Sequence, residues 1–110
     1  MSREKGNIAE KIVVSFLEKR NFNIIETNFY AKKLGEIDII AKKGEIYHFC
    51  EVKSGIDYEA AILNLTSKKL SKIKKSVEYY LQTKNLNPSF CIDAIIINNN
   101  EVELIENITI

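Results

Sequence analysis

The sequence has few of the features that mark a special class of protein. Its 110 residues include one proline and two cysteines, and the formal net charge is only +1. Such a small charge excludes a chain that attracts nucleic acid over its whole surface, so any basic contact surface must be local. No run of about 20 apolar residues is present, which excludes a transmembrane helix. Repeats, low-complexity segments and linkers are also missing.

Two cysteines are too few for a disulfide framework. Cys50 and Cys91 both lie in apolar segments, which predicts buried free thiols in a reducing compartment rather than a disulfide or a zinc knuckle. The first residues lack the apolar stretch of a signal peptide, so a cytoplasmic location is expected. With 45% hydrophobic and 28% charged residues, the composition is that of one globular domain spanning residues 1–110.

Hydrophobic periodicity predicts helices and strands in the order α-β-β-β-α-β-β. Apolar residues recur at helical spacing over residues 7–20, and Thr66 or Ser67 can cap a second long helix that ends near Lys84. Strands are predicted at 22–30, 36–42, 45–53, 90–97 and 102–105, with a short helical turn at 58–62. This order predicts an α/β sandwich with a mixed central sheet, in which the strand after the second long helix adds in parallel.

Charged residues lie inside two neighbouring apolar strands. Asp38 is on the first of them, two residues after Glu36, and Glu51 and Lys53 are on the second. Because side chains alternate along a strand, Glu51 and Lys53 share one face while Val52 points to the other. Charged groups are costly to bury without partners, so their presence here indicates a functional site.

The pattern is typical of a divalent-metal site for phosphodiester hydrolysis, although Glu-x-Lys alone also fits a surface salt bridge. Carboxylates of Asp38 and Glu51 and the backbone carbonyl of Val52 are oxygen ligands suited to Mg²⁺ or Mn²⁺. Lys53 would orient the attacking water and stabilise developing negative charge. Glu10, at the margin of the apolar face of the first helix, can lean toward the metal, but an acid there also complements the helix dipole. Glu36 either assists the metal or lies near the edge of the sheet.

Lysines are concentrated on the second long helix. Lys68, Lys72 and Lys75 form a stripe that can follow a phosphate backbone, although the same stripe also fits the solvated face of an amphipathic helix. Lys69 borders the apolar face and is expected to reach the cleft. Lys69 and Lys72 are therefore the candidate nucleic-acid contacts.

Four further strand residues carry structural expectations. Tyr47 and Phe49 share the face of Glu51 and are expected to pack beneath the first helix. His48, on the other face, is expected to pack in the protein rather than to act as a ligand. Asp93 lies in the middle of an apolar strand, so it needs a buried partner such as a lysine or a backbone amide.

With these residues in place, the chain resembles the YraN family of bacterial proteins, a branch of the restriction-endonuclease-like PD-(D/E)xK superfamily that includes Holliday junction resolvase-type nucleases. The resemblance covers residues 6–97. It is carried by Gly6, Ala9, Glu10, Phe16, Leu17, Asn28, residues 35–41, Phe49, residues 51–53, Lys69, Tyr80, Leu81 and Asp93. It implies a three-layer restriction-endonuclease-like sandwich. It also implies that Asp38, Glu51 and Lys53 occupy the catalytic positions of the superfamily, with Glu10 as the helix acid.

Three positions depart from the family pattern. Tyr30, Gly55 and Cys91 stand where many members of the family carry arginine. Arginine binds phosphate with several donors at once, so each replacement removes a candidate phosphate contact. The metal-site residues are unaffected by these departures.

Residues and resemblance together predict a small nuclease that hydrolyses DNA, with branched or processed DNA as a candidate substrate and Mg²⁺ or Mn²⁺ as cofactor. A domain of this size offers little surface for a duplex, which favours a homodimer. Two alternatives fit the same sequence. The missing arginines and the low net charge favour a non-catalytic nucleic-acid-binding or assembly module with the same fold. The second alternative is a protein-binding scaffold, in which the acids remain from a former active site.

Overall fold

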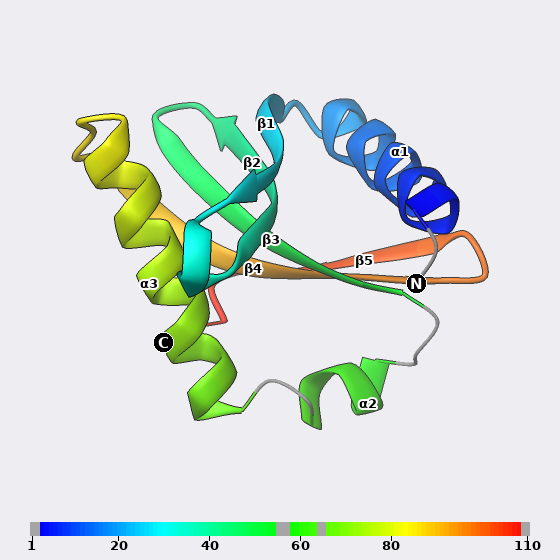
Figure 1. Cartoon of the computed structure of the whole chain (residues 1–110). Helices are drawn as coiled ribbons and strands as arrows, with labels where there is room; N and C mark the ends of the chain where they lie inside the picture. The colour runs from blue at the N-terminus through cyan, green and yellow to red at the C-terminus, as the bar shows by residue number, and fades with distance from the viewer. Residues whose placement is uncertain (1–2, 55–57, 64–65, 109–110) are drawn as a thin grey trace.

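The computed structural model describes residues 3–54, 58–63 and 66–108. Its elements follow the order predicted from the sequence (Figure 1). They are helix α1 (Arg3–Lys19), strand β1 (Asn23–Tyr30), a 3₁₀ turn η1 (Lys32–Leu34), strands β2 (Glu36–Lys43) and β3 (Ile46–Ser54), helices α2 (Tyr58–Leu63) and α3 (Ser67–Thr83), and strands β4 (Ser89–Asn98) and β5 (Glu101–Ile105). None of the helices in the described part of the chain is both long and apolar enough to cross a bilayer.

The strands form one five-stranded sheet in the order β1-β2-β3-β4-β5. The first three strands are an antiparallel meander. Strand β4 then pairs with β3 in parallel, because the chain crosses over through α3 before it returns to the sheet. Strand β5 closes the sheet as an antiparallel hairpin with β4. The predicted mixed sheet is therefore confirmed.

The two long helices cover opposite faces of the sheet and make three layers (Figure 1). On one face, Val13 and Leu17 of α1 pack against strand residues. On the other face, Val77 and Tyr80 of α3 do the same. The strand residues under α1 are Ile39, Ala41, Cys50, Ile95 and Ile97, and those under α3 are Ile37, Ile40, Phe49 and Ile92.

The prediction that Tyr47 and Phe49 pack beneath the first helix is wrong. The Phe49 ring is fully buried against Tyr80 of α3, with ring centroids 5.6 Å apart, and Tyr47 stacks beside Phe49 at 6.2 Å. Alternation along a strand shows which residues share a face, but it does not show which helix covers that face. As a consequence, the face that carries Glu51 and Lys53 lies under α3.

Local capping accounts for the ends of the helices. The Oγ1 atom of Thr66 accepts a hydrogen bond from the backbone N–H of Lys69 at 3.3 Å, so Thr66 is the N-cap of α3. Asn21 and Asn85 follow the ends of α1 and α3 with φ angles of 69° and 55°. Asparagine tolerates this left-handed conformation better than most residues, so it can stop a helix here without glycine.

Gly35 allows the turn before β2 to approach α3 closely. Its φ is 135°, and a Cβ at this position would lie 3.3 Å from Ser76 Oγ and 3.7 Å from Lys72 Cε. Gly44, in the β2–β3 hairpin, also has a positive φ, of 60°, but an added Cβ would meet nothing within 4 Å.

We therefore expect Gly35→Ala to lower the free energy of unfolding by roughly 2 to 4 kcal/mol, because backbone strain and overpacking add. The matched control Gly44→Ala should cost only about 1 kcal/mol, because it changes backbone strain alone. Urea unfolding of the two variants measures the difference. Equal losses would show that the approach to α3 does not constrain Gly35.

Candidate functional site

The candidate site lies where strands β2 and β3 separate. Their register ends with the pair Ile39–Cys50. Asp38 precedes Ile39 on β2, and here a side chain bonds β3 in place of the backbone. Its Oδ2 accepts a hydrogen bond from the backbone N–H of Val52 at 2.7 Å. On a strand, the N–H and C=O of one residue point toward the same neighbour, so the carbonyl of Val52 also faces the β2 side. Oxygen atoms of both residues are therefore directed into the gap between the strands.

Glu51 and Lys53 form an ion pair on the α3 face of β3. Lys53 Nζ lies 3.2 Å from Oε1 of Glu51, and both side chains are partly buried. The predicted alternation is confirmed, because Phe49, two residues before Glu51, belongs to the apolar cluster under α3. The pair holds the lysine ammonium next to a carboxylate at the sheet surface.

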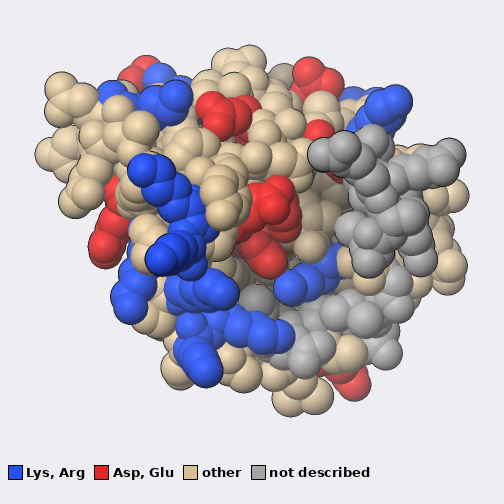
Figure 2. Space-filling view, viewed as in Figure 1, with Lys and Arg blue, Asp and Glu red and all other residues tan. Residues whose placement is uncertain are grey.

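One cavity of about 340 Å³ joins these residues to α3. It is lined by Leu34, Gly35, Glu36, Asp38, Glu51, Lys53, Lys69, Lys72, Ile73 and Ser76. Figure 2 shows acidic side chains gathered at the middle of one face of the molecule, with basic side chains along their lower and left borders. Acids from the sheet and lysines from α3 thus face one another across a shared space.

Asp38 is the most electrostatically perturbed carboxyl of the cavity. Burial, and then the charges of the Glu51 and Glu36 carboxylates, raise the pKa of Asp38 from 3.8 to about 7. The Val52 N–H and the Lys53 ammonium oppose this rise in pKa, but they do not cancel it. The folded chain therefore has a site that disfavours negative charge at Asp38 unless a cation is added.

Glu10 does not line the cavity, and its recorded side-chain contact is with strand β1. Its Oε2 accepts a hydrogen bond from Nδ2 of Asn28 on β1 at 2.6 Å. Asn28 stands between the registered pairs Thr27–Ile39 and Phe29–Ile37, so it lies opposite Asp38 across the β1–β2 pair. The structure thus places the helix acid beside the strand that carries Asp38.

The lysines of α3 divide into two groups. Lys69 and Lys72 line the cavity, and of these two the sequence predicted only Lys69 to reach the cleft. The other three lysines of this helix are exposed and do not line the cavity: Lys68, Lys74 and Lys75. Some lysines of α3 therefore face the acids across the cavity, whereas others face only solvent.

Sequence reasoning missed the buried Ser76 at the cavity wall. Its Oγ donates to the backbone carbonyl of Lys72 at 3.2 Å, so the hydroxyl is satisfied within α3. A serine inside an otherwise amphipathic helix is a weak signal, and its close approach to Gly35 could not be predicted without the tertiary structure. Of the three positions that lack the family arginine, Tyr30 is exposed, Cys91 lies away from this cavity, and Gly55 is outside the described residues.

Comparison with known proteins assigns the chain to a protein family. The model of "Uncharacterised protein family UPF0102" matches residues 9–97, a range that contains every predicted site residue. The chain belongs to the UPF0102 family. This is the YraN-like family that the sequence resembles, so that prediction is confirmed.

UPF0102 relatives match along nearly their whole length. A UPF0102 protein of Aliarcobacter butzleri is 66% identical over 109 residues, which are 99% of this chain and 99% of the relative. A UPF0102 protein of Wolinella succinogenes is 54% identical over 110 residues, which are 100% of both chains. A third, from Helicobacter hepaticus, is 49% identical over 109 residues, or 99% of this chain and 97% of the relative. The names of these relatives state no activity.

Proposed function

We propose that this UPF0102 protein is a divalent-metal-dependent nuclease that hydrolyses phosphodiester bonds in DNA, with branched or processed DNA as its substrate class. The observation that carries the proposal is the shared cavity, which is lined by Asp38, Glu51 and Lys53 from the sheet and by Lys69 and Lys72 from α3. Phosphodiester hydrolysis needs an activated water and neutralisation of phosphate charge, and these residue types serve both needs.

The donor set fits Mg²⁺ or Mn²⁺. Asp38 and Glu51 offer carboxylate oxygens, and the Val52 carbonyl faces the same gap between the strands. The raised pKa of Asp38 is further support, because a cation would relieve the repulsion from Glu51 that contributes to it. When bound, such an ion polarises the phosphate and lowers the pKa of a coordinated water.

Lys53 is proposed to orient the nucleophile. The Glu51 carboxylate holds its ammonium at 3.2 Å, which fixes the direction of the remaining N–H donors. These donors can bind an attacking water or a non-bridging phosphate oxygen, and the positive charge stabilises negative charge that develops there. Glu10 is proposed to support the site from α1, where its carboxylate accepts a hydrogen bond from Asn28 on the strand next to β2.

Lys69 and Lys72 are proposed to bind the DNA backbone. We expect Lys69→Ala and Lys72→Ala each to reduce the slope of log affinity against log salt by about one, because each removes one phosphate contact. Lys75→Ala is the matched control, since Lys75 is an exposed lysine of the same helix that does not line the cavity. Fluorescence anisotropy with a labelled DNA duplex measures the slopes. An equal effect of all three substitutions would indicate non-specific attraction instead.

Incubation with duplex, single-stranded and branched DNA tests the proposal. Cleavage is expected with Mg²⁺ or Mn²⁺ and not after chelation of the metal. If no substrate is cut, but salt-sensitive binding survives in Asp38→Asn, the chain is a non-catalytic nucleic-acid-binding module. If neither cleavage nor binding is found, the nucleic-acid proposal is wrong and a protein-binding scaffold remains.

A homodimer is part of the proposal, because one copy covers a short stretch of DNA. The chain measures 38 × 31 × 28 Å. At about 3.4 Å per base pair, its longest dimension spans roughly eleven pairs. A branched junction presents two equivalent strands, which two copies of the site would fit. Sedimentation of the protein with and without DNA measures the stoichiometry.

A further inference from the structure

A second cluster of metal-binding side chains lies on the opposite, α1 face of the sheet. His48 of β3 stands in register with Cys91 of β4, and Asp93 is two residues farther along β4 on the same face. His48 is 6% exposed and Asp93 is fully buried, whereas Cys91 is only partly buried. The prediction of two buried thiols is therefore wrong for Cys91, because its side chain lies near the end of β4, where the sheet is less covered.

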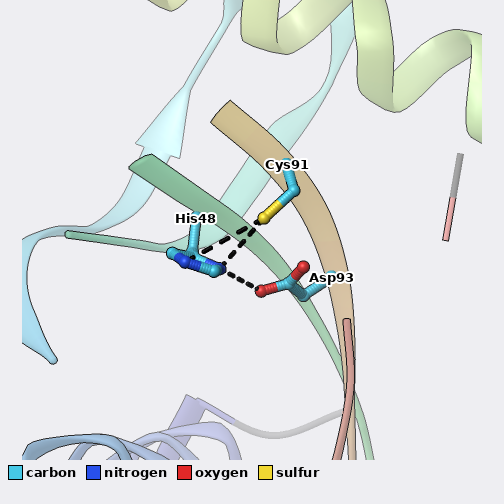
Figure 3. A group of neighbouring side chains, drawn as sticks. All are labelled: His48, Cys91 and Asp93. Atoms are coloured by element: carbon cyan, nitrogen blue, oxygen red, sulfur yellow. Dashed lines mark hydrogen bonds and ion pairs between the residues drawn. The ribbon is translucent and has the colours of Figure 1, made fainter. Parts of the chain in front are cut away.

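The three side chains converge on one point. His48 Nδ1 lies 2.6 Å from Oδ2 of Asp93 and 3.1 Å from Sγ of Cys91. Figure 3 shows the imidazole facing both the thiol and the carboxylate. One potential ligand atom from each residue lies within 4.8 Å of the other two. The predicted backbone-amide partner of Asp93 is confirmed, because the N–H of Asn107 donates to its Oδ1 at 2.9 Å. The histidine partner was not predicted from the sequence.

We propose that His48, Cys91 and Asp93 form a binding site for Zn²⁺ or a similar borderline-soft divalent ion. Imidazole nitrogen, thiolate sulfur and carboxylate oxygen are the three ligand types that zinc takes in proteins. One thiolate and one carboxylate balance the two positive charges of the ion, so the buried complex carries no net charge. The site therefore differs in chemistry from the all-oxygen site under α3.

The distances suit this ion after a small adjustment. Zinc bonds of about 2.0 to 2.3 Å in tetrahedral geometry separate ligand atoms by roughly 3.3 to 3.7 Å. The present separations of 2.6 and 3.1 Å from Nδ1 are shorter, so these ligand atoms must move apart by somewhat less than about 1 Å to admit the ion. The Asn107 N–H already fixes the other carboxylate oxygen, as outer partners of metal ligands commonly do.

The fourth coordination position faces a cavity. A space of about 450 Å³ is lined by His48 and Cys91 and also by Glu106 and Asn107, which follow β5. A water molecule can fill the fourth position, which keeps the complex uncharged. Since Asn107 bonds Asp93, and Ile108 N–H bonds the carbonyl of Ile92, an ion here would tie the segment after β5 to the sheet.

A cysteine nucleophile is the main competing role for this cluster, and the chemistry opposes it. Burial and the nearby Asp93 carboxylate raise the pKa of the Cys91 thiol to about 12. A thiol with so high a pKa is protonated near neutral pH and is a poor nucleophile. A bound ion must displace this proton, as it does for thiolate ligands in general.

Titration of the reduced, metal-free full chain with Co²⁺ tests the proposal, because a Co²⁺–thiolate bond produces a charge-transfer band in the near ultraviolet. We expect the band to appear and Zn²⁺ to displace Co²⁺ with a dissociation constant below about 1 μM. Cys91→Ser should abolish the band and weaken Zn²⁺ binding at least about 100-fold. His48→Gln should weaken it comparably, with circular dichroism to confirm folding.

Two controls separate this site from its neighbours. Cys50→Ala removes the other thiol of this face, which is buried and pairs with Asp93 in the strand register, and it should leave the band unchanged. Asp38→Asn removes a ligand of the other proposed site and should also leave the band unchanged. A missing band in the parent chain, or a band that survives Cys91→Ser, would overturn the proposal without affecting the proposed nuclease.

Discussion

Lys53→Ala is expected to abolish metal-dependent DNA cleavage, with kcat falling at least about 1,000-fold. The substitution removes the ammonium that lies 3.2 Å from Glu51, and with it the donors that face the reacting water and phosphate. It leaves both carboxylates in place and removes a competing positive charge. Binding of Mn²⁺ should therefore persist, or tighten slightly, while turnover is lost.

Calorimetry with Mn²⁺ and a single-turnover cleavage assay separate these two effects of Lys53→Ala. The matched control is Lys43→Ala, which removes an exposed lysine at the far end of β2 and should change neither quantity. Loss of Mn²⁺ binding together with cleavage would assign Lys53 a structural role instead. Full activity in Lys53→Ala would remove this residue from the mechanism.

Asp38→Asn is expected to stabilise the metal-free protein at alkaline pH while it abolishes metal binding. The folded chain holds the Asp38 proton more tightly than the unfolded chain does, since the pKa rises from 3.8 to about 7. This group therefore lowers the stability of the fold as the pH rises from about 4 to 7, and its full cost remains above 7. A neutral asparagine avoids that cost and can still accept the Val52 hydrogen bond.

We expect Asp38→Asn to raise the free energy of unfolding by roughly 2 to 4 kcal/mol at pH 8.5 without divalent ions, and by close to zero at pH 4. Saturating Mg²⁺ or Mn²⁺ should reverse the order, because the ion stabilises only the parent chain. Urea unfolding at the two pH values measures both effects. Glu36→Gln is the control, and its effect should be smaller because Glu36 is exposed. A less stable Asp38→Asn at pH 8.5 would contradict the electrostatic account.

Both predictions arise from one physical conflict at the site. The carboxylates lie close together and are partly buried, so their negative charges lower the stability of the fold. Such a cost is common at functional sites, because charge arranged for a ligand is not optimal for the free protein. The stability of the variants therefore reports on the function of the site even before a substrate is known.

Local chemistry explains why the sequence predicted the elements so closely. The apolar periodicity of α1 and α3, the Thr66 cap and the alternating strands are all determined by neighbours within a few residues. The pairing of Glu51 with Lys53 was predictable for the same reason, because residues two apart on a strand always share a face.

Contacts between distant segments were not predictable in this way. The sequence did not show that α3 would cover Phe49, that Glu10 would bond Asn28 of β1, or that His48 would meet Cys91 and Asp93. Each of these depends on the register between strands or on the side of the sheet that a crossover takes. The spacing of residues along one strand determines neither the register between strands nor the side of the crossover.

The sequence by itself determined which residues form helices and strands and which acids and lysine share a strand face, because these properties follow from local backbone geometry. Only the tertiary structure decided that the acids under α3 meet Lys69 and Lys72, and that a nitrogen, a sulfur and an oxygen converge beneath the other face. The reason is that long-range strand pairing and helix packing bring together side chains that are up to 45 positions apart.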